Sequence, residues 1–290
     1  MELLRIELYK IFKRPRTYIA FTVIGAIILL IQVGFKFGGQ EYVDLLMTGV
    51  NETFEVPPNE ILNGYLVCFI VLNLLLIHVP ILVALIAGDM ISGEANMGTL
   101  RLLVSKPISR TRLLLVKFTA ACGYTILLVI WVALLSLLVS ILLFGTNDLF
   151  VSRESDSNII AASDVLWRYI AAFAFASIGM LMIASLSFML SVFADNSIGP
   201  IVATVCIIIV FTILTQLQIP FYDTIKPYLF TTHMLGWKGF FYVKGVDGVT
   251  TKGSIENLPA IIKSASILLG YTAIFLLIAI WYFRKKNILS

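Results

Sequence analysis

Reactive side chains are few in this sequence, and none of them falls in a known catalytic spacing. His78 and His233 are the only histidines, and the motifs HExxH and GxSxG, which hold a metal or a nucleophile, do not occur. The three cysteines lie within long apolar runs, where cysteine is usually a small buried hydrophobe. Asp89 and Glu94 share a polar loop, and such a carboxylate pair is more often a solvated turn than an acid/base dyad. The sequence therefore predicts neither an enzyme nor a bound cofactor or metal.

Polar side chains inside the apolar runs are the other candidates for a functional role. An ionisable or hydrogen-bonding group in such a run faces the protein interior or a wet cavity, so it can line a pathway. For His78 a structural role competes with this one, because Pro80 leaves a backbone carbonyl without its helical donor. The candidates for lining a pathway are Asn73, His78, Thr212 and Gln216.

Composition predicts that lipid surrounds most of the chain. Hydrophobic residues make up 59% of the sequence and charged residues 13%, and the mean hydropathy is +0.97. Six runs are continuously apolar and close to the roughly 20 residues that a helix needs to cross a bilayer, which favours an all-α polytopic protein over a β-barrel with alternating strands. The expected spans are Tyr18–Gly34, Ile61–Gly88, Leu113–Phe144, Trp167–Ala194, Ile198–Ile219 and Ile262–Phe283.

The basic residues predict the orientation of these spans. Lys and Arg accumulate on the cytoplasmic side of a membrane, and here they concentrate before the first span, between the second and third, and after the sixth. We therefore expect both termini in the cytoplasm, and the net charge of +4 gives no reason to expect a nucleic-acid partner. Four further basic residues are expected to snorkel at membrane edges: Lys36, Lys117, Arg168 and Lys263.

Three segments outside the spans have patterns of their own. Residues 1–17 space their apolar side chains as an amphipathic interfacial helix does, although a disordered basic anchor is the alternative. Residues 220–261 mix aromatic residues with Gly and charge, which predicts an extracellular loop with short helices held at the membrane interface. Its aromatic-belt candidates are Tyr228, Trp237, Phe240 and Tyr242.

The segment 89–110 is the most distinctive, because glycines and Pro107 delimit a short helix between two spans. Met97 and leucines on one face, with charges at the rim, would suit docking to another protein. An ordinary inside loop that obeys the charge rule is the alternative. Ser109 or Thr111 is placed to cap the third span.

The string EANMGTLRLLVSKPISRTRLLLVK, which begins at Glu94, resembles the cytoplasmic loop of ABC-2 type permeases. The matching elements are Glu94, Gly98, Thr99, Leu100, Lys106, Pro107, Ser109, Arg110 and Lys117. This resemblance implies the transmembrane subunit of an ABC exporter in a bacterial-type plasma (inner) membrane, with this loop as the coupling helix. It also implies a dimeric pathway, formed with a second copy or a homologous permease.

The resemblance assigns contact with a separate ATPase subunit to Glu94, Met97, Thr99, Leu100 and Arg101. The chain has no GxxxxGK[ST] phosphate loop, so ATP and Mg²⁺ are expected to bind to that partner instead. A secondary transporter and a non-transporting scaffold or sensor subunit are the alternatives. A secondary transporter would need intramembrane carboxylates for ion coupling, and the spans hold none except Asp89 and Asp195 at their ends.

Overall fold

The structure is a computed structural model that describes residues 2–48, 61–105, 107–153, 156–217, 224–242, 255 and 257–287. In chain order, its first half contains α1 (Glu2–Lys13), α2 (Pro15–Thr48), α4 (Gly64–Leu74), α5 (His78–Ala87), α6 (Ser92–Asn96) and α7 (Thr99–Val104). There follow α8 (Arg110–Ala133), the π-helix η1 (Leu134–Val139), α9 (Ser140–Phe144), β1 (Leu149–Arg153), β2 (Asp156–Ile160) and α10 (Ala162–Phe193). The last elements are α11 (Ile198–Gln216), η2 (Lys226–Tyr228), α13 (Phe230–Met234), η3 (Leu235–Phe240) and α14 (Leu258–Lys285).

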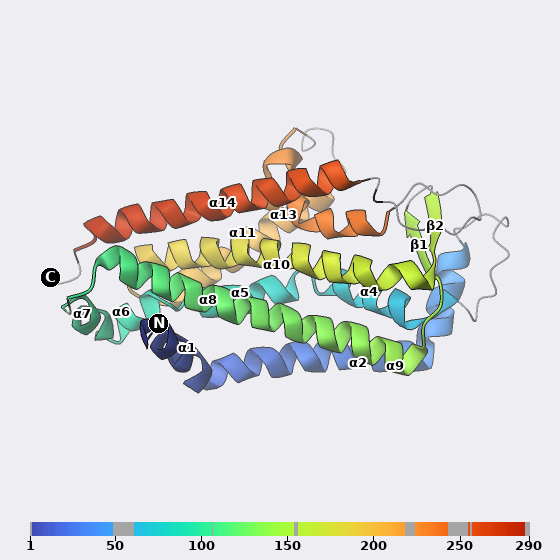
Figure 1. The fold of residues 1–290 in the computed structure, drawn as a ribbon, viewed down its shortest axis with the longest axis horizontal. Helices are drawn as coiled ribbons and strands as arrows, with labels where there is room; N and C mark the ends of the chain where they lie inside the picture. The colour runs from blue at the N-terminus through green and yellow to red at the C-terminus, as the bar shows by residue number, and fades with distance from the viewer. Residues whose placement is uncertain are drawn as a thin grey trace.

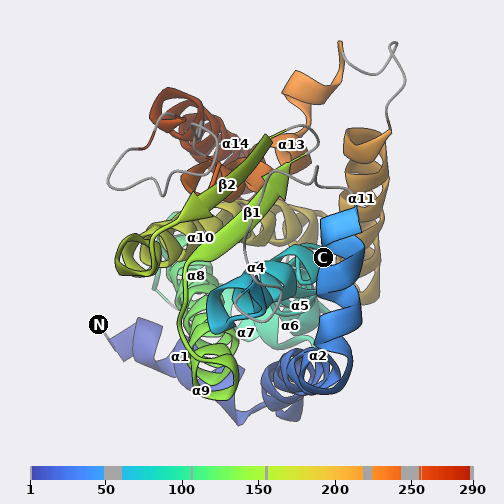
Figure 2. The ribbon, with the colours of Figure 1, turned by 90° about the vertical axis from the view of Figure 1, so that its right-hand side faces the viewer.

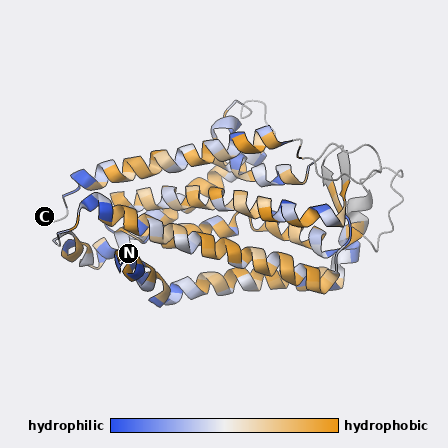
Figure 3. Cartoon of the chain, viewed as in Figure 1, coloured by the Kyte–Doolittle hydropathy of each residue, from blue (hydrophilic) through white to orange (hydrophobic). Residues whose placement is uncertain are grey.

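The long helices run roughly along one axis and form an elongated bundle (Figure 1). We call the end with α1, α6, α7 and the last turn of α14 the terminal end, since both chain termini lie there, and the opposite end the hairpin end. An apolar band separates these two more polar ends (Figure 3). This is the distribution expected of a helical membrane protein.

Within the part of the chain that the structure describes, five helices are long and apolar enough to cross a membrane. A sixth crossing is obtained if α4 and α5 are counted as one span, although they are bent by 52° at residues 75–77. The structure thus has the mostly helical, multi-pass character that the sequence predicts, and the count of six depends on that bent pair. The predicted end of the fifth span at Ile219 lies outside the described residues.

Helix α2 is longer than the sequence suggests. It starts at Pro15, where proline is favoured in the first helical turn, and continues past the predicted end at Gly34 to Thr48. A Cβ atom on Gly39 would lie 2.7 Å from the end of the Leu62 side chain, whereas one on Gly34 or Gly38 would have no atom within 4 Å. These glycines therefore lie within a continuous helix and do not end it.

The third span is one continuous rod of 35 residues from Arg110 to Phe144, close to the predicted start at Thr111 and end at Phe144. Within it, η1 adopts the wider π geometry, which displaces backbone groups from their usual partners. Gln32 of α2 donates hydrogen bonds from Nε2 to Leu135 O at 3.0 Å and to Ser140 Oγ at 2.9 Å. The π segment is therefore tied to α2 by a buried side chain.

The expectation of an all-α fold is corrected in one place. Strands β1 and β2 form an antiparallel hairpin at the hairpin end, with Leu149 opposite Ile160. Both of these side chains are fully buried. Asn63 secures the base of the hairpin, because it caps α4 and donates from Nδ2 to Asp148 O at 2.8 Å.

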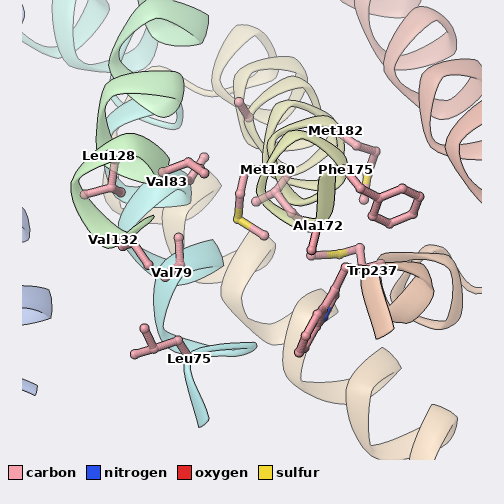
Figure 4. Close-up of a cluster of buried hydrophobic side chains, with 14 of the residues drawn as sticks. Leu75, Val79, Val83, Leu128, Val132, Ala172, Phe175, Met180, Met182 and Trp237 are labelled. Atoms are coloured by element: carbon pink, nitrogen blue, oxygen red, sulfur yellow. The ribbon is translucent and has the colours of Figure 1, made fainter. Parts of the chain in front are cut away.

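The hydrophobic core centres on α10, the span with the most buried residues. Side chains from α5, α8 and α10 meet there, and Trp237 reaches in from η3 (Figure 4). Trp237 and Phe240 are buried, so their predicted place in an interfacial aromatic belt is wrong. Tyr228 is exposed and Tyr242 is partly buried.

Arg168 is also corrected, from a snorkelling residue to a fully buried one. Its Nη2 lies 2.7 Å from Asp164 Oδ2, and its Nη1 donates to Phe240 O at 2.7 Å. The ion pair and the carbonyl satisfy the buried guanidinium. Arg168 therefore holds the short helices after α11 against α10.

Candidate functional site

The segment between α5 and α8 lies at the terminal end, beside α1 (Figure 1). It contains two short helices, α6 and α7, where the sequence predicts one. Gly98 separates them with φ +72°, a left-handed conformation that favours glycine. Ser109 caps α8 as predicted, since its Oγ accepts a hydrogen bond from Arg112 N at 3.3 Å. We call residues 88–105 the loop segment.

Helix α10 fixes the start of the loop segment. Ser191 Oγ accepts hydrogen bonds from Ile91 N at 3.1 Å and from Ser92 N at 2.9 Å. One buried hydroxyl thus satisfies two backbone groups at the start of α6. A Cβ atom on Gly88 would lie 2.8 Å from Ser187 Oγ, so the backbone approaches α10 closely. The segment is packed onto the bundle at this point.

Four alternating charges join the loop segment to α1 and α8. Lys10 Nζ lies 2.8 Å from Glu7 Oε1 and 2.9 Å from Glu94 Oε1. Lys117 Nζ lies 2.8 Å from Glu7 Oε2 and 2.7 Å from Glu94 Oε2. Each acid therefore contacts both bases, and the group has no net charge. We call Glu7, Lys10, Glu94 and Lys117 the charge ring.

Burial makes the charge ring sensitive to the loss of any member. Glu7, Glu94 and Lys117 are buried, and removal of one partner from such a pair leaves an uncompensated charge in a poorly solvated site. Burial alone raises the pKa of Glu7, but Lys117 and Lys10 outweigh this effect and hold that pKa below its ordinary value. Burial likewise lowers the pKa of Lys10, but hydrogen bonds to Glu7 and Glu94 raise it above its ordinary value.

A second group of charges lies next to the ring. Asp89, at the end of α5, forms ion pairs with Arg14 and Arg16 at the junction of α1 and α2. The Asp89 side chain is also packed against Gly93. The exit from the bent span is thus attached to the junction of the first two helices. A movement of the loop segment would have to carry these elements along or break their ion pairs.

The residues predicted to contact an ATPase divide into two sets. Glu94 is 4% exposed and Leu100 is 2% exposed, so neither side chain is available to a partner in this conformation, and we correct their assignment to an internal role. Met97 is 56% exposed, and Thr99 and Arg101 are also exposed. For these three residues, contact with an ATPase remains a prediction.

Sequence reasoning missed three members of the charge ring and one exposed residue. Lys117 was expected at the membrane edge, but it is fully buried. Glu7 lies among the apolar positions of α1. An acid on an apolar helix face was the sequence feature that could have indicated a buried charge here. Leu102 is 67% exposed, and with Met97, Thr99 and Arg101 it forms what we call the exposed ridge.

Three of the four predicted pathway residues come together in the structure. Asn73, Thr212 and Gln216 line one pocket of about 230 Å³ between the end of α4, α11 and α13. His78 is not among the described residues that line it. Its Nδ1 lies 2.9 Å from Leu74 O at the bend between α4 and α5. This is a structural hydrogen bond at a kink, but its carbonyl is not that of Leu76, the one that Pro80 leaves without a helical donor.

Comparison with known proteins places the chain in a family. Residues 23–289 match a family described as "Protein of unknown function (DUF2705)". The chain belongs to the DUF2705 family. It is also similar to "Uncharacterized protein YhcI" of Bacillus subtilis (strain 168), with 26% identity over 215 residues. That match covers 70% of this chain and 63% of the relative. The DUF2705 match begins within α2 and extends past α14, so it leaves out α1 and the start of α2.

Proposed function

We propose that this DUF2705 protein is the permease subunit of an ATP-binding cassette exporter in a bacterial-type plasma membrane. Two copies, or one copy and a homologous permease, form the pathway, and both termini are cytoplasmic. The ATPase docks on the exposed ridge of the loop segment. This proposal rests on the contrast between the two sides of the loop segment. Its outer side is exposed, whereas its inner side contacts α1, α2, α8 and α10.

The contacts of the loop segment support a route for force. Ser191 joins it to α10, and Glu94 joins it to α1 and α8 through the charge ring. Helix α8 continues as a rod over 35 residues to α9, which at about 1.5 Å per residue spans both bilayer surfaces. A displacement of the ridge by an ATPase would therefore reach the hairpin end through backbone that is continuously helical.

The proposal is tested by substitution of the exposed ridge. The chain is purified in mild detergent with the ATPase that accompanies it, and the ATP turnover of the complex is measured in liposomes. Met97→Asp and Leu102→Asp should each lower that turnover about tenfold, because loss of a buried apolar contact at an interface costs about 1–3 kcal/mol. Tyr228→Asp is the matched control, since Tyr228 is also an exposed apolar side chain but lies between α11 and α14.

Two results would contradict the proposal directly, and a third would favour a different kind of subunit. One is that ridge variants and the control all retain full ATP turnover with the ATPase still bound. The other is activity of the chain with no ATPase present, which would favour a secondary transporter. A bound partner without any ATP-dependent transport would favour a scaffold or sensor subunit.

A further inference from the structure

The end of α4 separates two pockets of different character. The first, of about 230 Å³, lies toward α11 and α13, and the second, of about 310 Å³, lies toward α2 and β1. Asn73 and Leu74 line both. These residues immediately precede the bend between α4 and α5, and the bend residues Leu76 and Ile77 line the first pocket as well. Figure 2 shows α2, α4 and β1 side by side at the hairpin end.

The first pocket offers hydrogen-bonding groups that the protein leaves partly unused. Asn73 donates one amide hydrogen to Phe69 O at 2.8 Å, and its Oδ1 has no partner among the described residues. The side-chain amide of Gln216 likewise makes no hydrogen bond within the described part of the chain. Thr212 donates to Ile208 O at 2.7 Å, which leaves its oxygen able to accept, whereas the hydroxyl of Thr215 already lies 2.7 Å from that of Thr231. Asn73 is partly buried and Gln216 is exposed, so both amides are accessible to a hydrogen-bonding guest in this pocket.

The second pocket is apolar and aromatic. Phe35 and Tyr42 of α2, Phe69 of α4 and Phe150 of β1 form its walls, with aliphatic side chains between them. Its size and lining suit a hydrocarbon chain or a small apolar group. No charged side chain lines either pocket among the described residues. A guest with a full charge would therefore be buried without a counter-ion.

We propose that the two pockets form one binding site for an uncharged amphiphile. Its polar group binds at Asn73, Thr212 and Gln216, and its apolar part passes Leu74 into the aromatic pocket. That this amphiphile is the transported substrate rests on the proposed function, whereas binding itself does not.

Binding is tested with a monoacylglycerol that carries a photoreactive diazirine in its acyl chain. The chain is placed without any ATPase in phosphatidylcholine nanodiscs, irradiated, and its labelled peptides are identified by mass spectrometry. We expect labelling of peptides that contain Phe35, Phe69 or Phe150, and competition by unlabelled monoacylglycerol but not by added phosphatidylcholine. Diazirine analogues of a fatty acid and a fatty amine should label these peptides less, since each carries a charge.

Variants separate a specific site from ordinary contact with lipid. Asn73→Leu and Gln216→Leu should each lower this labelling about fivefold, the effect of one neutral hydrogen bond. Leu74→Trp should lower it as well, because the larger side chain fills the junction of the pockets. Leu277→Trp is the matched control, since Leu277 is an exposed leucine on α14. All variants should keep the melting temperature of the wild type.

Equal labelling in Leu74→Trp and Leu277→Trp would overturn the proposal, as would equal labelling by charged and uncharged probes. Displacement by phosphatidylcholine would also overturn it, because the site would then hold only the surrounding bilayer lipid. None of these results depends on an ATPase. Failure here therefore leaves the assignment as a permease subunit untouched, and the ridge variants test that assignment separately.

Discussion

Two acids and two bases at the terminal end show how this chain places charge next to a bilayer. Each carboxylate of the charge ring contacts both ammonium groups, so the four residues are compensated only as a set. Burial of such a set is often neutral for stability, but removal of one member is not. The ring is therefore better understood as a device that fixes the position of the loop segment than as a source of stability.

Lys117→Met should destabilise the protein by about 3–5 kcal/mol, because it leaves the buried carboxylates of Glu7 and Glu94 with too little positive charge. The double variant Glu94→Gln/Lys117→Met should be less damaging than the single variant, since it removes one charge of each sign. SDS titration in mixed micelles gives the free energy of unfolding. Lys13→Met is the control, as Lys13 is exposed, and equal effects of Lys117→Met and Lys13→Met would refute the role of the ring.

The pH dependence of stability follows from the same residues. The pKa of Glu7 is held below 4.5, so its contribution is present above that pH and is lost as the pH falls through the lowered pKa. The pKa of Lys10 is raised above 10.5, so its contribution is present below that pH and is lost as the pH rises through the raised pKa.

We therefore expect a melting temperature in detergent that changes little near neutral pH and falls at both extremes. Glu7→Gln should weaken the dependence on the acid side. A wild-type melting temperature that rises below pH 4.5 would contradict this assignment.

At the scale of elements, interruptions of regular helix distinguish this bundle from a set of straight spans. The bend between α4 and α5 borders the first pocket, and the π segment η1 lies within the longest span. A π segment leaves carbonyl groups that need other donors. Gln32 supplies one from a neighbouring helix, so the irregularity is stabilised by tertiary contact.

Gln32→Leu should cost about 1–3 kcal/mol, because Leu135 O and Ser140 Oγ would lose a buried donor. The same SDS titration measures this cost. Thr22→Val on the same helix is the control, since the Thr22 hydroxyl is exposed and bonds only to Tyr18 O of its own helix. A cost for Gln32→Leu no larger than that of Thr22→Val would show that η1 does not depend on α2.

The long spans were predictable from sequence because continuous apolar runs of sufficient length have few alternatives in a bilayer. The hairpin was not, since β1 and β2 are only five residues each and their pairing depends on tertiary packing. Polarity alone selected Asn73, Thr212 and Gln216 as candidates for lining a pathway, but it did not predict that they line one pocket. The burial of Glu94 was not predicted either, because its partners Glu7 and Lys117 come from distant parts of the chain.

At the scale of the whole molecule, both termini and the loop segment lie at one end and the hairpin at the other (Figure 1). The distribution of basic residues predicts that the terminal end faces the cytoplasm. Asn96 and Tyr228 are exposed and provide markers for the loop segment and for the segment between α11 and α14.

In a variant without native cysteines, Tyr228→Cys should react with a membrane-impermeant maleimide on intact spheroplasts. Asn96→Cys should react only after the membrane is permeabilised. Gel shift after the reaction measures both. The reverse pattern would place the loop segment outside the cell, and it would contradict the proposed contact with an ATPase.

The charge ring also has a consequence for biosynthesis. When the ribosome has completed only α1 to α7, Glu7 and Glu94 share a single base, Lys10, and the excess acid is matched only once Lys117 is translated. A nascent chain that stops before α8 therefore carries an uncompensated carboxylate beside the membrane. In such a product Lys10 is the one base of the charge ring that can join α1 to the loop segment, so this junction is completed only when α8 is made.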